Sequence, residues 1–152
     1  MKLTRARSRH PWLAELENIE YFAALSHDAL RQASRYVDRA DVPEGARLQR
    51  QGMAARWIWI PISGLLQLRR DGEPAGLVLP GSAYGEREML LGGPSRVDVF
   101  AAWPSTVVSI EAPAWHALMD IPSFAAGVAR RMALTGASTG SVLSGTNGAL
   151  AV

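Results

Sequence analysis

The sequence predicts a mainly β fold with flanking helices, and three observations lead to this prediction. Glycines and prolines recur every 4 to 12 residues between residues 42 and 110, which is the spacing of turns between the short strands of a barrel or sandwich. Residues with helical periodicity stand before and after this region. The chain has 152 residues, of which 48% are hydrophobic and 20% are charged, so it is long enough to form one domain with its own core.

Helices are expected ahead of the strands. Apolar residues at spacings of three and four between Trp12 and Leu25 have the period of one amphipathic helix or of two short ones. Ser26 is a predicted N-cap, and Asp28 follows in the first turn, where a carboxylate suits the helix dipole. We expect this next helix to end near Arg39.

Short strands are expected between the turns. Asp71-Gly72 is the predicted tight hairpin turn. In the strand that begins at Trp57, the tryptophans share one face and the isoleucines share the other, which indicates burial on both sides. The expected strands are residues 47–50, 57–60, 65–69, 77–79, 97–102 and 107–110.

Helical periodicity returns after the strands. It starts after Pro113 and again after Pro122, and the second of these helices is expected from Ser123 to about Leu134. The following residues are uncharged and rich in glycine and serine, which is typical of a flexible tail. We therefore expect an N-terminal arm at residues 1–11, a domain at 12–134 and a tail at 135–152.

Basic charge is concentrated in the N-terminal arm. The formal net charge is +2, but Lys2, Arg5, Arg7 and Arg9 leave 12 basic against 14 acidic residues in the rest of the chain. A solvated basic arm explains this distribution better than a DNA-binding face does. No segment reaches the ~20 apolar residues that cross a bilayer, and the arm lacks the features of a secretory signal. We expect a cytoplasmic protein without membrane contact.

The sequence argues against several enzyme classes. It contains no cysteine, which excludes thiol nucleophiles, disulfide scaffolds and cysteine-ligated zinc or iron–sulfur sites. His10, His27 and His116 stand singly, whereas a metal cupin needs two or more histidines on adjacent strand positions. Nucleophile-elbow and Walker motifs are also missing. We expect a protein that is not an enzyme and holds no metal.

An ordered set of motifs marks the region between the helices. These motifs are Leu25-Ser26, Glu44-Gly45, Gly52, the apolar run 57–62 leading into Ser63-Gly64, the segment 80–86, and Gly93-Pro94-Ser95-Arg96. Together they resemble the cyclic nucleotide-binding domain of catabolite-activator-type regulators and of the regulatory subunit of protein kinase A. The resemblance covers about residues 16–132 and implies a double-stranded β-helix, that is, a jelly-roll β-roll.

The resemblance implies a phosphate-binding cassette. Its first part is Ala83, Tyr84, Gly85 and Glu86, and its second part begins at Arg96, 11 residues after Gly85 as in the bacterial branch. A glycine lets the backbone come close to a ligand because it has no Cβ. An ionised glutamate can accept a hydrogen bond from a ribose hydroxyl, and an arginine can pair with a phosphate.

Two residues depart from the family pattern. Val97 stands where the family has a small hydroxyl residue, so it offers a backbone amide but no side-chain hydrogen bond. Asp98 stands where the family has alanine. In a strand it shares a face with Arg96, about 6.5–7 Å away. At that distance it would repel a phosphate by on the order of 2.5 kcal/mol, which is similar to the attraction that Arg96 would supply.

The resemblance implies a regulatory sensor module with a cyclic nucleotide, cyclic AMP or cyclic GMP, as its ligand. Two alternatives stay open, namely a degenerate domain used only for protein interaction or oligomerisation, and a truncated transcription regulator. In catabolite-activator-type regulators a long helix leads into a winged helix-turn-helix, but only 32 residues follow Asp120 here. We therefore expect no sequence-specific DNA binding. A protein partner or a homodimer through the C-terminal helix is the expected assembly.

Overall fold

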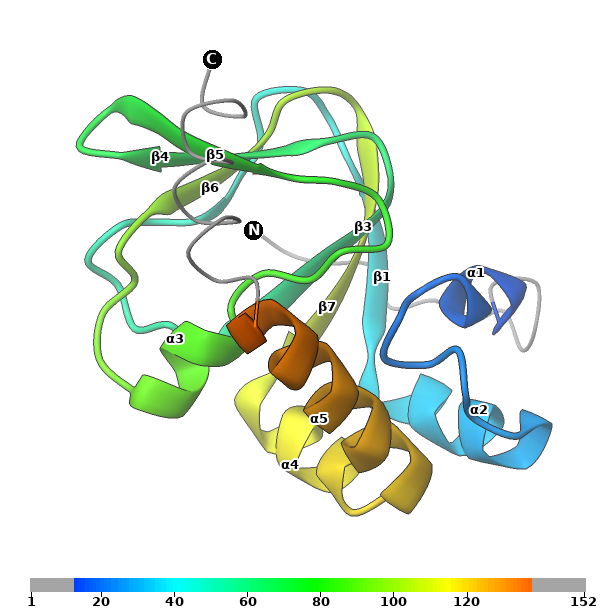
Figure 1. The fold of residues 1–152 in the computed structure, drawn as a ribbon. Coiled ribbons are helices and arrows are strands. Elements are labelled where there is room, and N and C mark those ends of the chain that lie inside the picture. The colour runs from blue at the N-terminus through cyan, green and yellow to red at the C-terminus, as the bar shows by residue number, and fades with distance from the viewer. Residues whose placement is uncertain (1–12, 138–152) are drawn as a thin grey trace.

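Two antiparallel sheets form a roll, and most of the helices gather at one end of it (Figure 1). The computed structural model describes residues 13–137. The strands are β1 (Asp38–Val42), β2 (Arg47–Gln49), β3 (Trp57–Ser63), β4 (Leu66–Arg70), β5 (Glu73–Val78), β6 (Asp98–Ala101) and β7 (Ser105–Glu111). They pair in the orders β1-β7-β3 and β2-β6-β4-β5. This arrangement confirms the predicted β-roll.

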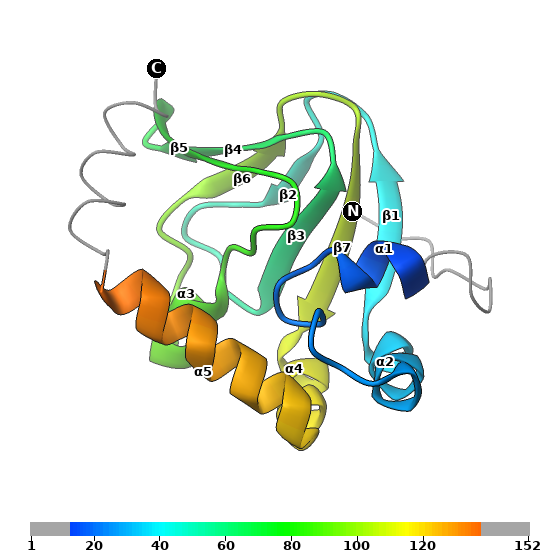
Figure 2. The same ribbon diagram turned by 45° about the vertical axis from the view of Figure 1, so that its right-hand side comes forward.

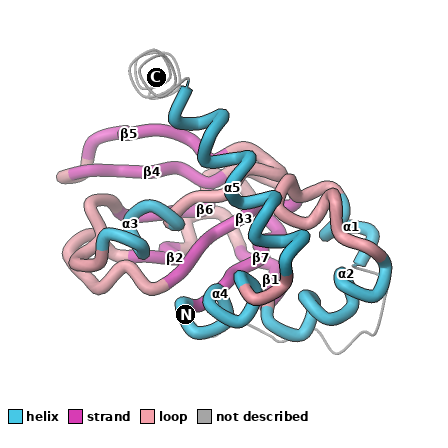
Figure 3. Tube along the Cα trace, turned by 60° about the horizontal axis from the view of Figure 1, so that its bottom comes forward, coloured by secondary structure: helices cyan, strands magenta, loops and turns pink. Residues whose placement is uncertain are grey.

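The helices pack against the face of the β1-β7-β3 sheet that points away from the interior of the roll. They are α1 (Leu13–Glu17), α2 (His27–Ala33), the 3-10 turn η1 (Ser34–Tyr36), α3 (Glu86–Leu91), α4 (Ala112–Met119) and α5 (Pro122–Ala137). Seen from the helical end, α5 runs across the roll, with α3 on one side and α1 and α2 on the other (Figure 3). Figure 2 shows α3 between α5 and the strands. Helix α5 is thus placed next to the predicted cassette.

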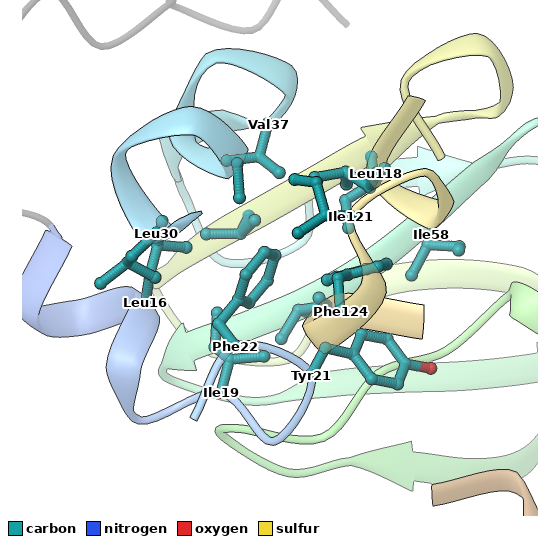
Figure 4. Packing of buried hydrophobic residues seen from close by; sticks show 14 of the residues in the cluster. Leu16, Ile19, Tyr21, Phe22, Leu30, Val37, Ile58, Leu118, Ile121 and Phe124 are labelled. Carbon is teal, nitrogen blue, oxygen red and sulfur yellow. The ribbon is translucent and has the colours of Figure 1, made fainter. Parts of the chain in front are cut away.

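Two separate cores hold the roll and the helices together. Ile58 and Ile60 of β3 belong to the core beneath the helices, where Trp115 and Phe124 pack edge to face with ring centroids 5.5 Å apart. Figure 4 shows Ile58 and Phe124 in this core. Trp59 belongs to the second core, inside the roll. The structure thereby confirms that this strand is buried on both faces. Each fully buried isoleucine, leucine or phenylalanine side chain in these cores contributes about 1.5–3 kcal/mol to the free energy of unfolding, relative to an exposed one.

The predicted helix cap at Ser26 and the predicted hairpin turn at Asp71-Gly72 are both confirmed. The Ser26 side chain accepts a hydrogen bond of 3.1 Å from the amide of Ala29, which makes it the N-cap of α2. Asp71 and Gly72 have φ values of 53° and 82° and join β4 to β5. Two successive residues in this left-handed region form the turn that matches the twist of a hairpin.

The prediction that the second helix ends near Arg39 is wrong. Helix α2 ends at Ala33, and residues 38–42 form β1, which pairs with β7. The cause is tertiary pairing, since Ala40 and Val42 are buried and Asp41 is exposed. Strand β5 also begins earlier than expected, at Glu73. Pro74 is tolerated there because β5 is an edge strand.

Some predicted segments differ only in extent or lie outside the described residues. Helix α1 covers only the first part of the segment expected to be helical, and α5 continues to Ala137 instead of ending near Leu134. The predicted arm at residues 1–11 and the tail from residue 138 onward fall outside the described residues. Within residues 13–137, no helix has the length and apolar character needed to cross a membrane.

Replacing Leu118 by alanine should lower the free energy of unfolding by about 2–5 kcal/mol. Its side chain is fully buried in the core beneath the helices, so the substitution leaves a cavity. Leu91→Ala is a matched control because Leu91 is a helical leucine with 71% exposure, and it should change the free energy by less than about 0.5 kcal/mol. Urea unfolding measures both values, and equal losses would contradict the assignment of this core.

Candidate functional site

The cassette is fixed to β3 by backbone hydrogen bonds. The amide of Tyr84 donates to the Trp59 carbonyl at 2.9 Å, and the amide of Trp59 donates to the Tyr84 carbonyl at 2.8 Å. The amide of Gly81 donates to the Pro61 carbonyl, also at 2.8 Å. The segment before α3 therefore lies along β3, and its position depends on backbone groups that neighbouring substitutions leave in place.

Gly85 is required by its close approach to β3. Its φ is 118°, a conformation that side chains disfavour, and it caps the N-terminus of α3. A Cβ at this position would lie 2.5 Å from the Trp57 carbonyl oxygen. In the structure, the close approach that requires a glycine here is to the backbone of β3.

Glu86 lies in a half-buried cluster with Arg131 of α5. One Glu86 carboxylate oxygen is 3.6 Å from Arg131 Nε, and the two side chains are only 15% and 18% exposed. Arg131 Nη1 also donates to Glu20 at 2.9 Å, and Nη2 donates to the Ala83 carbonyl at 3.2 Å. One guanidinium therefore connects the cassette, α5 and the segment after α1.

Tyr21 also belongs to this cluster, because its ring packs against Arg131. The guanidinium of Arg131 lies 5.5 Å from the centre of the Tyr21 ring. Burial raises the pKa of Tyr21 well above its usual range, the negative charge of Glu86 raises it further, and Arg131 opposes both effects. Tyr21 Oη, Glu86 Oε2 and Arg131 Nε are buried and have no hydrogen-bond partner among the described residues. The cluster thus contains polar atoms that could accept a new partner.

Glu88 ties the two parts of the cassette together. The Tyr84 hydroxyl donates to Glu88 Oε1, and the amide of Arg96 donates to Glu88 Oε2 at 3.2 Å. Burial raises the pKa of Tyr84 well above its usual range, and the hydrogen bond to Glu88 and the charge of that carboxylate add to this effect. Arg70 acts in the opposite direction. The first and second parts of the predicted cassette are therefore adjacent in space.

Successive residues in the second part of the cassette point alternately to the surface and into the roll. Arg96 is exposed, and within residues 13–137 its side chain has no hydrogen bond or ion pair. Val97 is buried inside the roll, and its amide donates to the Ser95 hydroxyl at 3.3 Å. Asp98 is half-buried and accepts a hydrogen bond of 2.7 Å from the amide of Gln51. Among the described residues, the Arg96 guanidinium is thus free, while the groups around it are paired.

A buried polar chain occupies the interior near the cassette. Trp59 Nε1 donates to Gln49 at 2.9 Å, and Gln49 donates to the Ser95 hydroxyl at 2.6 Å. The Ser95 hydroxyl donates in turn to the Val97 carbonyl at 2.7 Å. Ser95 therefore holds the interior position beside Val97, while Arg96 is exposed. Alternation counted backward from Val99 through Val97 could have identified Ser95 from the sequence.

Two open hollows lie outside the cassette. One, of about 390 Å³, is lined by residues that include Val42, Pro43 and Pro104. The other, of about 520 Å³, is lined by residues of β2 and its surroundings, namely Arg47, Leu48, Gln49, Arg50 and Met53. Neither is lined by Gly85, Glu86 or Arg96. Both hollows are open to solvent, so the candidate site is the cassette with its specific contacts.

The described part of the chain offers no metal centre. Within residues 13–137, no group of three or more histidine, aspartate or glutamate side chains is placed to hold a metal ion. In the polar clusters described above, the carboxylates instead face arginine, tyrosine or amide donors. Such an arrangement suits recognition of a hydroxyl or an anion.

Comparison with known proteins identifies related sequences and folds. Residues 39–121, more than half of the chain, match the family model of the cyclic nucleotide-binding domain. A cyclic nucleotide-binding domain from Methylobacillus flagellatus has 18% identity and a TM-score of 0.71, and the match covers 86% of this chain and 82% of that one. Curated protein sequences gave no match.

Two protein kinase A regulators have a similar fold. The regulatory subunit of a cAMP-independent protein kinase A from Trypanosoma brucei has 19% identity and a TM-score of 0.70 over 84% of this chain and 48% of that one. The regulatory domain of Toxoplasma gondii protein kinase A, solved with cAMP, has 16% identity and a TM-score of 0.65 over 80% and 48%. The chain thus spans about half the length of these two regulators.

Gly85→Ala should destabilise the protein because the new Cβ meets the β3 backbone and the positive φ is disfavoured. We expect a loss of at least about 2 kcal/mol beyond that of Gly92→Ala. Gly92 is the matched control, since its φ is also positive, at 73°, but a Cβ added there would have no heavy atom within 4 Å. Thermal and urea unfolding compare the two, and equal losses would show that the close contact with β3 is unimportant.

The raised pKa of Tyr21 predicts a loss of stability at high pH. The unfolded chain releases this proton near the ordinary value of 10.0, whereas burial keeps it bound in the folded protein. The free energy of unfolding should therefore fall as pH rises above 10, by about 1.4 kcal/mol per pH unit for this group. Urea unfolding between pH 8 and 11 should show a shallower fall in Tyr21→Phe. An identical fall in both proteins would contradict the assigned burial of this hydroxyl.

Proposed function

Because the chain belongs to the cyclic nucleotide-binding domain family, we propose that it is a regulatory module whose cassette binds a cyclic nucleotide, with cyclic AMP or cyclic GMP as candidates. The observation that carries this proposal is the buried Oε2 atom of Glu86, which begins α3 and has no hydrogen-bond partner for this atom among the described residues. The Toxoplasma gondii regulatory domain, which has the same fold, was solved with cAMP. The module is proposed as a cytoplasmic, non-enzymatic protein.

Arg96 is the proposed partner of the ligand phosphate. Its guanidinium is exposed and unpaired among residues 13–137, so it can turn toward an anion without breaking an existing ion pair. Charge-assisted hydrogen bonds of this kind contribute about 1.5–3 kcal/mol each. Val97 and the backbone of Ala83, Tyr84 and Gly85 are the remaining proposed members of the site.

Glu86 is the proposed acceptor for the free ribose hydroxyl. Its Oε2 atom is buried and has no hydrogen-bond partner among the described residues, while Oε1 faces Arg131. A hydroxyl that donates to Oε2 would satisfy this atom while Oε1 still faces Arg131. Since Arg131 belongs to α5, the ligand and this helix would then share one carboxylate. Helix α5 is therefore the proposed output element, for a protein partner or a second copy of the chain.

A second candidate function is protein interaction without a nucleotide. Specific contacts favour it, because Arg131 already faces Glu86, Glu88 already accepts from the Arg96 amide, and Ser95 with Gln49 fills the adjoining interior. The Trypanosoma brucei regulatory subunit, which has a similar fold, belongs to a cAMP-independent protein kinase A. Under this function, α5 and its surroundings would contact a protein whatever the nucleotide concentration. Calorimetric titration with cyclic AMP and cyclic GMP distinguishes the two functions.

Asp98 is proposed to oppose binding only weakly. Its carboxylate is held by the Gln51 amide, and Arg69 stands opposite it in the β4–β6 pair. Both features reduce the effect of its charge on an anionic ligand at the cassette. We also propose that the chain binds no specific DNA sequence.

Arg96→Gln should weaken cyclic-nucleotide binding ten-fold or more, because it removes a charge-assisted contact worth at least about 1.4 kcal/mol. Arg130→Gln is the matched control, since Arg130 is also exposed and lies next to Arg131 on α5, and it should leave the dissociation constant unchanged. Isothermal titration calorimetry measures both proteins. Binding that is as tight in Arg96→Gln as in the original chain would place the phosphate elsewhere.

A further inference from the structure

The most unusual feature of the cassette is the position of Glu88. Its two carboxylate oxygens accept from different donors, Oε1 from the Tyr84 hydroxyl and Oε2 from the Arg96 amide. One of these donors precedes α3 and the other follows it. A negatively charged side chain of the protein thus occupies the place where the two halves of the cassette meet.

Glu88 differs from Glu86 in how its charge is compensated. Glu86 faces the guanidinium of Arg131, with 3.6 Å between the nearest atoms. Glu88 is half-buried, and within residues 13–137 it forms no ion pair, so its carboxylate contacts only a hydroxyl and an amide there. Within residues 13–137 no cationic side chain is paired with it, so it repels any anion that approaches the same donors.

We infer that Glu88 is an internal anion that competes with the ligand phosphate for the cassette, and so sets the concentration of cyclic nucleotide needed for binding. This inference rests on the proposed function. A phosphodiester that accepts from the Arg96 amide must first displace the Glu88 carboxylate. Until that carboxylate moves away, the two negative charges also repel each other.

The amide and the guanidinium of Arg96 differ in whether they are already occupied. With Glu88 on the Arg96 amide, the backbone donor is already satisfied, while the guanidinium remains exposed and unpaired among the described residues. An incoming phosphate would replace the Glu88 carboxylate at the Arg96 amide. It would also bind the Arg96 guanidinium. Glu88 thus lowers affinity without removing the site, which makes it an affinity-determining residue rather than a structural defect.

The test compares calorimetric titrations of the full chain, Glu88→Gln and Glu44→Gln with cyclic AMP and with cyclic GMP. Glutamine keeps the size and an acceptor oxygen but removes the charge. We expect Glu88→Gln to bind ten-fold or more tightly than the original chain. Glu44, an exposed glutamate between β1 and β2, is the matched control, and its substitution should leave the dissociation constant unchanged.

The outcomes separate this inference from the proposed function. Measurable binding with equal dissociation constants in the original chain and Glu88→Gln would overturn the inference and leave the function intact. No binding by either protein up to millimolar nucleotide would overturn both. Binding by Glu88→Gln alone would support both.

A readout without any nucleotide tests the contact itself. In Glu88→Ala the amide of Arg96 loses its acceptor, so its hydrogen exchange should accelerate ten-fold or more, as followed by nuclear magnetic resonance. The same amide in Glu44→Gln should exchange as it does in the original chain. Unchanged exchange in a folded Glu88→Ala protein would overturn the inference, because Glu88 would then not occupy this donor.

Discussion

The arrangement of the candidate site depends on the half-buried guanidinium of Arg131. It joins Glu20, the Ala83 carbonyl and Glu86, and so fixes α5 against both the cassette and the segment after α1. Removing one member of this largely buried pair leaves an uncompensated charge, which destabilises the fold. The position of α5 and the availability of Glu86 are therefore controlled by the same contact. Any ligand that engages Glu86 acts on α5 as well.

The two carboxylates of α3 give the cassette opposite tendencies. Glu86 is balanced by Arg131 and offers an unpaired oxygen, as a hydroxyl acceptor requires. Glu88 accepts from the amide of Arg96, whose guanidinium is the proposed partner of an anion. A regulatory module with weak affinity and an interaction module without a ligand both fit this description. They differ in whether the exposed guanidinium of Arg96 can recruit an anion against Glu88.

The sequence allowed the roll to be predicted because its turns carry local signals, such as Asp71-Gly72, and because β3 has apolar residues on both faces. Strand β1 could not be predicted, since only its pairing with β7 separates it from the preceding helix. In the site, Gly85 and Glu86 could be found from their motif. Arg131 and Glu88 could not, because their roles arise from α5 packing on the cassette and from the chain returning to α3 after Gly92.

The most direct test of the central claim is a titration of the isotopically labelled chain with cyclic AMP, followed by the amide resonances in nuclear magnetic resonance spectra. If the cassette binds the nucleotide and passes the effect to α5, the amides of residues 83–97 and those around Arg131 will shift together and saturate at the same concentration. Saturating shifts confined to other parts of the roll, or no shifts at millimolar nucleotide, would contradict this account.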